Sequence, residues 1–123
     1  MGKFGETFLN WEVMAQYAPK IVEGFFVTIQ LAAVIVLSGL CAGLLLAVIR
    51  TLRVKVLNFF IVLAVDVLRA VPPLVLIMIL YFALPTVGVR FSGFVATWLA
   101  LSAILAAFAE EIFWAGILAV PRG

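Results

Sequence analysis

Residues 25–49 read FFVTIQLAAVIVLSGLCAGLLLAVI, an unbroken run of 25 uncharged residues. As an α-helix this run would be about 37 Å long, enough to cross a hydrocarbon layer about 30 Å thick. A lone apolar segment in lipid must pair its own backbone N–H and C=O groups, and only a helix does so within one segment. The run therefore predicts a membrane-spanning helix and an all-α membrane protein.

The composition agrees with a chain that lies in a lipid bilayer. Hydrophobic residues make up 67% of the sequence and charged residues 11%, with a net charge of +2. That small excess does not form the clustered basic face that nucleic-acid binding requires. The chain has no histidine and no G-x-S-x-G, H-E-x-x-H or G-x-x-x-x-G-K-[ST] motif, and Cys41 has no partner for a disulfide. We expect no catalytic, cofactor-binding or metal site and no enzyme activity.

A second span is predicted over residues 56–84, and it contains the pair Pro72 and Pro73. Proline lacks a backbone N–H and its ring clashes with the preceding turn, so the helix must kink or unwind there. At membrane depth such a break is tolerated where protein or water covers the freed backbone. The broken face is therefore expected to lie toward a partner or a solute pathway.

A third span is predicted over residues 91–120, and with three spans the two termini lie on opposite sides of the membrane. The connection 50–55 carries Arg50, Arg53 and Lys55 with no acidic residue, whereas the other connection carries only Arg90. Basic connections favour the cytoplasmic side. This pattern predicts a multi-pass protein with an external N-terminus and a cytoplasmic C-terminus.

Residues 1–24 are predicted to form a separate N-terminal segment at the membrane interface. Within it, residues 4–18 alternate aromatic and aliphatic side chains with polar ones, a pattern typical of an amphipathic helix that lies on the membrane. A disordered leader is the alternative.

Charged residues inside a span cost about 2.5 to 3.5 kcal/mol each on insertion scales, so each needs a partner or a purpose. Asp66 and Arg69 are three residues apart and can pair on one helix face, which they share with Asn58 and Pro73. This face is either an internal ion pair near the interface or the lining of a route for a polar solute.

Glu110 and Glu111 follow 19 uncharged residues of the third span. Near the end of a span a glutamate can extend to the headgroups at small cost, and we expect this of at least one of the two. Glu110 shares a helix face with Trp114, whereas Glu111 points about 100° away. The two glutamates therefore need not share one role.

Gly39 and Gly43 form a G-x-x-x-G pattern within the first span. Small residues at this spacing allow a second helix to approach closely. General helix packing is a more common use of the pattern than a dedicated dimer interface.

Three segments, in this order, resemble the polar-amino-acid type permease subunits of bacterial ABC importers. GFFVTIQLA at 24–32 is similar to the G-x-x-x-T-x-x-L opening of the family's first helix, and VDVLRAVPPLVLIMILYFALP at 65–85 is similar to its R-G-T-P-L-L-V-Q-x-x-x-x-Y-F-x-L-P stretch. AFAEEIFWAGILAVPRG at 107–123 resembles A-Y-x-A-E-I-x-R-G-G-I-x-A-I-x-x-G-Q, which aligns Glu111 with the family's glutamate. Trp114 stands where the family usually has arginine.

The resemblance implies a subunit that moves polar amino acids or similar small solutes across the bacterial inner membrane into the cytoplasm. It implies a second permease subunit, cytoplasmic ATP-binding subunits that hydrolyse ATP, and a periplasmic solute-binding protein. Asp66, Arg69, Pro72, Pro73 and Glu111 are the candidates for the substrate pathway or a subunit contact. Residues 25–123 would be the N-terminal three-helix part of the transmembrane domain, ending before the EAA coupling loop. The alternative is a three-span scaffold or assembly subunit without a transport role.

Overall fold

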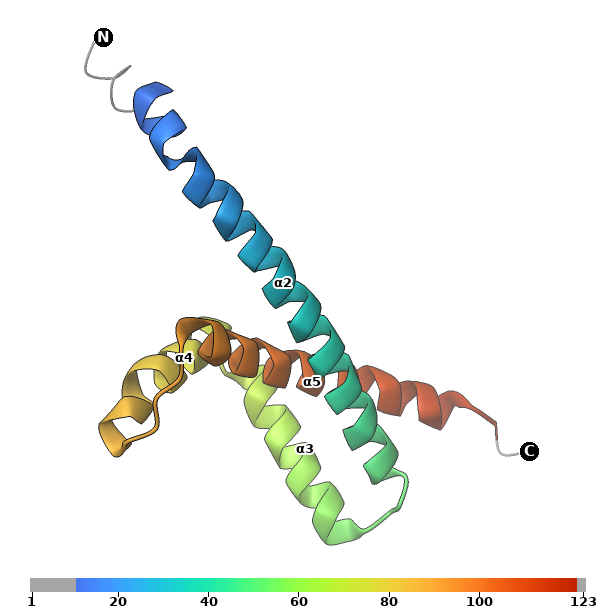
Figure 1. The fold of residues 1–123 in the computed structure, drawn as a ribbon. Helices are drawn as coiled ribbons and strands as arrows, with labels where there is room; N and C mark the ends of the chain where they lie inside the picture. The colour runs from blue at the N-terminus through green and yellow to red at the C-terminus, as the bar shows by residue number, and fades with distance from the viewer. Residues whose placement is uncertain (1–10, 122–123) are drawn as a thin grey trace. The chain divides into compact units, whose positions relative to one another are not determined.

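The computed structural model describes residues 11–121, and Figure 1 shows their fold. The elements are α2 (Trp11–Arg50), α3 (Lys55–Ala70), α4 (Pro73–Met78), the π-helix η1 (Ile79–Ala83), the 3-10 helix η2 (Leu84–Val87) and α5 (Gly93–Ala119). No strand occurs between residues 11 and 121, so the all-α prediction is confirmed. The chain divides into two compact units that meet between Ala32 and Ala33.

The described part of the first unit, residues 11–32, is helical throughout and belongs to α2. Helix α2 continues through residue 24 and includes Pro19, and the predicted division of the chain at residue 24 stays a prediction. Lys20 and Glu23 lie within this helix, because charged side chains do not remove a backbone hydrogen bond. The predicted interfacial helix is not confirmed, and residues 1–10 lie outside the described range.

Two helices, α2 and α5, are long and apolar enough to cross a membrane. A third candidate consists of α3 followed by residues 73–87, two pieces that are bent by 102° at a short break. Length and composition allow this bent pair to be one broken span or a re-entrant loop. The prediction of three spans therefore stays a prediction.

In the second unit, the residues of α2 from Ala33 onward pack closely against α5. A Cβ atom built on Gly39 would lie 2.8 Å from Leu105 Cδ2, and one on Gly43 would lie 2.8 Å from the Ala106 carbonyl oxygen. Trp98 Nε1 also donates a hydrogen bond of 3.0 Å to Ser38 Oγ. The G-x-x-x-G pattern thus serves a helix crossing within the chain.

The third partner in this packing is α3, which a short turn joins to α2 (Figure 1). Ile61 and Val65 of α3 and Ala107 of α5 form a buried apolar cluster, flanked by Leu46, Ile49 and Leu68. Because most buried residues of α5 are alanines, its backbone lies near both neighbours. This close approach decides which polar side chains can meet.

The break predicted at the two prolines is confirmed. Helix α3 ends at Ala70, Val71 is extended with φ −82° and ψ 128°, and Pro72 caps α4. The residue before a proline is disfavoured in the helical region, which explains the extended Val71. The predicted span over 56–84, with its break at the prolines, corresponds to α3, α4, η1 and η2, and Gly88 follows η2 with φ +90°.

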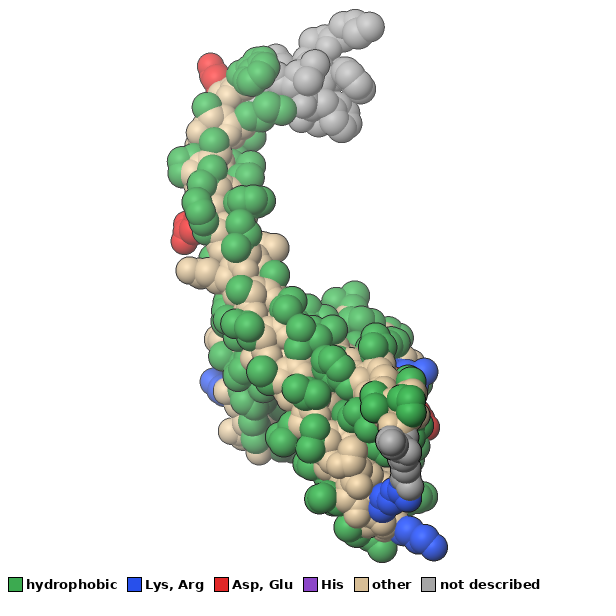
Figure 2. Space-filling view, turned by 90° about the vertical axis from the view of Figure 1, so that its right-hand side faces the viewer, with side chains coloured by type: hydrophobic (Ala, Val, Ile, Leu, Met, Phe, Trp, Pro, Cys, Tyr) green, Lys and Arg blue, Asp and Glu red, His purple; other side chains and the backbone are tan. Residues whose placement is uncertain are grey.

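The third predicted span corresponds to α5. Ser92 Oγ accepts a hydrogen bond of 3.2 Å from the Val95 N–H and so caps the first turn. Hydrophobic side chains cover most of the visible surface in Figure 2, and many large ones are exposed along all the long helices. Such a surface is suited to lipid rather than to water.

Candidate functional site

A buried ion pair joins the end of α2 to the middle of α5. Arg50 Nη1 donates a hydrogen bond of 2.8 Å to Glu110 Oε1, across sixty positions of sequence. The Glu110 side chain is fully buried and that of Arg50 is 13% exposed. A charge-assisted contact at this distance in a low-dielectric setting fixes both side chains.

The geometry of this ion pair follows from the crossing of α2 and α5 at Gly43, about two helical turns before Arg50. A Cβ atom at Gly43 would lie 3.1 Å from the Glu110 backbone nitrogen and 2.8 Å from Ala109 Cβ. Only glycine therefore allows α5 to come this near to α2. Arg50 lies seven residues further along α2, on the same helix face, and so reaches the Glu110 carboxylate.

Further ion pairs extend from Arg50 to α3. Glu111 Oε1 lies 3.9 Å from Arg50 Nη1 and 3.6 Å from Arg69 Nη1, and Arg69 Nη1 lies 3.7 Å from Asp66 Oδ1. We call Arg50, Asp66, Arg69, Glu110 and Glu111 the polar cluster. It joins α2, α3 and α5 at one level of the second unit.

The inner part of the polar cluster holds polar atoms that lack a partner among the described residues. These atoms are Glu110 Oε2 and Arg50 Nε, together with Oδ1 of the neighbouring Asn58. Asn58 Nδ2 contacts the Arg50 carbonyl oxygen at 3.4 Å. An unsatisfied buried polar group costs about 1 to 3 kcal/mol of folding stability, so these unpaired atoms destabilise the folded chain.

Two aromatic rings lie against the arginines. The Arg50 guanidinium carbon is 4.4 Å from the centre of the Trp114 ring, and that of Arg69 is 5.8 Å from the centre of the Phe108 ring. A cation over an aromatic face is stabilised by about 0.5 to 2 kcal/mol, depending on desolvation. Both rings belong to α5, so this helix supplies carboxylates and ring faces together.

The predicted candidates divide between two places. Asp66, Arg69 and Glu111 lie in the polar cluster, and the expected pairing of Asp66 with Arg69 is confirmed. Pro72 and Pro73 form the break between α3 and α4. The role of these five residues in a substrate pathway or a subunit contact stays a prediction.

Sequence reasoning missed the centre of the polar cluster. Arg50 was counted among the basic residues of a connection, and Glu110 was treated as able to extend to the headgroups. The shared face of Glu110 and Trp114, opposite the small residues of α2, was the available signal. Among residues 11–121, no three His, Cys, Asp or Glu side chains are grouped so as to hold a metal ion.

Comparison with known proteins identifies relatives with one kind of function. No family model matches the chain. A Rickettsia conorii protein named "Putative glutamine transport system permease protein GlnP" is 35% identical over 117 residues, which is 92% of this chain and 54% of the relative. The Bacillus subtilis "Probable glutamine ABC transporter permease protein GlnM" is 34% identical over 94% of this chain and 53% of its own length.

Two further similarities agree with these. The Bacillus subtilis L-cystine transport system permease protein TcyB is 30% identical over 95% of this chain and 50% of its own length. A crystal structure of an amino acid ABC transporter matches with a TM-score of 0.81 and 29% identity, over 90% of this chain and 52% of that one. The chain spans about half the length of the curated relatives it matches.

The structure is all-helical over residues 11–121, and the relatives are permeases of amino-acid transport systems. More particularly, the chain is homologous to the permeases of amino-acid ABC transporters over about nine tenths of its length. The resemblance read from the three sequence segments is therefore confirmed.

Proposed function

We propose that this chain belongs to a permease subunit of an ABC importer that moves polar amino acids, or similar small polar solutes, into the cytoplasm. The observation that carries the proposal is the similarity over nine tenths of the chain, in both sequence and fold, to amino-acid permeases. The two helices suited to a membrane agree with it. ATP would be hydrolysed by a separate partner subunit.

The proposal includes the setting of the subunit. Its partners would be a second permease subunit, cytoplasmic ATP-binding subunits and a periplasmic solute-binding protein, in the bacterial inner membrane. The basic turn with Arg50, Arg53 and Lys55 supports a cytoplasmic location for that turn, since basic residues favour this side. With three spans, the N-terminus would lie outside and the C-terminus in the cytoplasm.

We further propose that Asp66, Arg69 and Glu111 of the polar cluster, with the break at Pro72 and Pro73, face the solute pathway or a second subunit. The Arg69 and Glu111 side chains are 39% and 40% exposed, although they lie among helices that otherwise expose hydrophobic side chains. Charges at membrane depth turn toward protein or water rather than lipid. A neighbouring subunit or a hydrated pathway would satisfy that requirement.

A chimera tests the function. Residues 1–123 would replace the matching 117-residue segment of the Rickettsia conorii relative, and the chimera would be reconstituted in proteoliposomes with that relative's partner subunits. We expect ATP-dependent uptake of radiolabelled glutamine or another polar amino acid. Co-purification with the ATP-binding subunit shows that the chimera assembles. An assembled chimera that transports no polar amino acid, beside an active parent, would contradict the proposal.

A further inference from the structure

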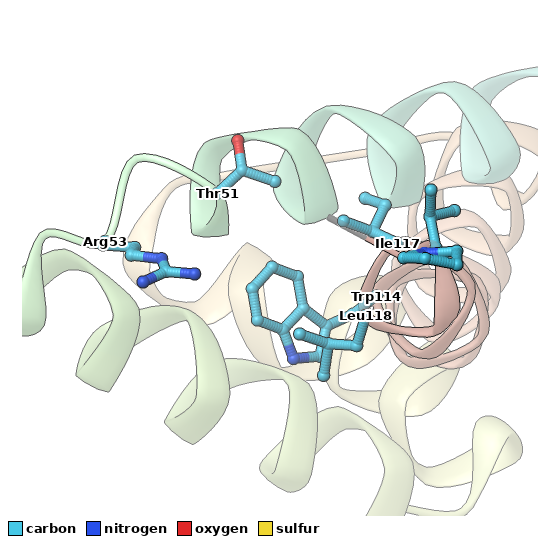
Figure 3. A pocket seen from close by; sticks show the side chains of 7 residues that line it. Thr51, Arg53, Trp114, Ile117 and Leu118 are labelled. Carbon is cyan, nitrogen blue, oxygen red and sulfur yellow. The ribbon is translucent and has the colours of Figure 1, made fainter. Parts of the chain in front are cut away.

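A pocket of about 550 Å³ lies beside the turn between α2 and α3. Thr51 and Arg53 of the turn line one side, and residues at the end of α5, among them Trp114, Ile117 and Leu118, line the other. Figure 3 shows the Arg53 guanidinium pointing across the pocket toward the Trp114 indole. The pocket therefore has one cationic side and one mainly apolar side.

Arg53 holds an unusual backbone conformation at this place. Its φ is +57°, and it is the one residue other than glycine with a positive φ among residues 11–121. Its N–H donates a bond of 3.2 Å to the Arg50 carbonyl oxygen, so it ends α2 in the left-handed position that glycine usually takes. For a residue with a Cβ this conformation costs about 1 to 2 kcal/mol. Strained residues of this kind concentrate at functional sites.

The Arg53 guanidinium is also unpaired within the described chain. Arg50 and Arg69 each contact carboxylates, whereas no ion pair or hydrogen bond joins the Arg53 side chain to another residue of the range 11–121. A guanidinium has five N–H donors in a planar fork that matches a phosphate group. Arg53 therefore presents an open site for an anion at the pocket.

The side chains on the opposite side of the pocket indicate which kind of anion fits. Trp114 is fixed there by the Arg50 guanidinium, 4.4 Å from its ring centre, and the neighbouring side chains of Ile117, Leu118 and Val120 are apolar. Apart from the Trp114 indole N–H, these side chains offer a free phosphate ion no hydrogen-bond donor. An amphiphile with a phosphate headgroup and a hydrocarbon part matches both sides.

The position along the chain points to the same ligand. The pocket lies at the end of α2, a helix suited to a membrane, beside a turn with Arg53 and Lys55 and no acidic residue. Basic pockets between helices at a membrane surface bind anionic headgroups, and tryptophan is enriched at that level. A zwitterionic lipid would bring its own cation near these two residues and is disfavoured.

We propose that this pocket binds an anionic phospholipid, with the headgroup phosphate on the Arg53 guanidinium and the glycerol and first acyl carbons against the end of α5. The proposal is independent of transport, since it needs only that this end of the second unit lies at a membrane surface. Binding of the headgroup phosphate would explain why Arg53 holds its strained conformation.

Native mass spectrometry of the 123-residue chain in neutral detergent tests the proposal, with phosphatidylglycerol and phosphatidylcholine added in equal amounts. We expect the chain to retain phosphatidylglycerol preferentially. Arg53→Gln should lower that retention about fivefold, the effect of one basic side chain at an anionic membrane surface. Arg90→Gln is the matched control, because it removes the same charge from an exposed position in the other connection.

A second variant separates binding from folding. Arg53→Gly removes the guanidinium and also relieves the positive φ, so this variant should lose the lipid as Arg53→Gln does while unfolding at the same or a higher temperature. Equal losses for Arg53→Gln and Arg90→Gln would overturn the proposal, since they would show general charge attraction. Equal retention of both lipids, or displacement by a tenfold excess of inorganic phosphate, would overturn it as well.

Discussion

Arg50, the last residue of α2, donates a hydrogen bond of 2.8 Å to Glu110, a fully buried residue in α5. Two charges that leave water lose several kcal/mol of solvation each, and their attraction offsets this only in good geometry. Here the geometry depends on Gly43, because a side chain at that position would push α5 away. The ion pair and the helix crossing are therefore coupled.

Removing the Glu110 carboxylate is expected to destabilise the chain strongly. Glu110→Ala leaves the Arg50 guanidinium largely buried without its partner, and breaking a buried pair costs about 3 to 5 kcal/mol. Glu111→Ala is the matched control, because that side chain is 40% exposed and its ion pairs are longer. It should cost about 1 kcal/mol or less. The free energy of unfolding in mixed detergent micelles measures both, and equal losses would refute the assignment of Glu110 as the inner partner.

A methyl group at Gly43 is expected to disturb the same site from the other side. Gly43→Ala would bring Cβ within 2.8 Å of the Ala106 carbonyl oxygen and of Ala109 Cβ. Overpacking of this kind costs about 1 to 3 kcal/mol. Gly24→Ala is the control, since nothing lies within 4 Å of that position. It should leave the free energy of unfolding unchanged or raise it by up to about 1 kcal/mol. A Gly43→Ala variant as stable as the parent would show that the helices separate without cost.

The sequence predicts well those features that depend on short stretches of chain. The membrane-suited helices follow from local hydrophobicity, and the break at Pro72 and Pro73 follows from a missing N–H and a steric clash. The pairing of Asp66 with Arg69 follows from a separation of three residues on one helix. Each of these depends on interactions within a few residues of one another.

The centre of the polar cluster depends on tertiary packing and could not be read from spacing. Arg50 and Glu110 are sixty residues apart, and they meet only because α2 crosses α5 at Gly43. Helix α2 also begins earlier than the predicted span over residues 25–49. Lys20 and Glu23 are unfavourable in lipid, but a helix can extend beyond the hydrocarbon layer, so charge marks the end of a span and not the end of a helix.

Replacing both prolines is expected to straighten the chain between α3 and α4. In Pro72→Ala with Pro73→Ala, the missing N–H groups are restored and Val71 is free to take the helical conformation. The bend of 102° should decrease, and spin labels at Leu63 and Phe82, two exposed positions on either side of the break, should move apart. Electron paramagnetic resonance measures this distance. Pro85→Ala, beyond the break, should leave it unchanged, and an unchanged distance in the double variant would show that tertiary contacts hold the bend.

Labelling from the two sides of the membrane decides whether the bent pair is one span. In a chain with Cys41→Ala, single cysteines would be placed at Leu52 and at Val89, both exposed and on opposite sides of the pair formed by α3 and residues 73–87. If the pair crosses the membrane, a membrane-impermeant thiol reagent added outside intact cells should label position 89 and not position 52. A re-entrant loop would place both positions on the same side, because the chain would return to the surface it left. That result would leave two spans in place of three and put the two ends of the chain on one side.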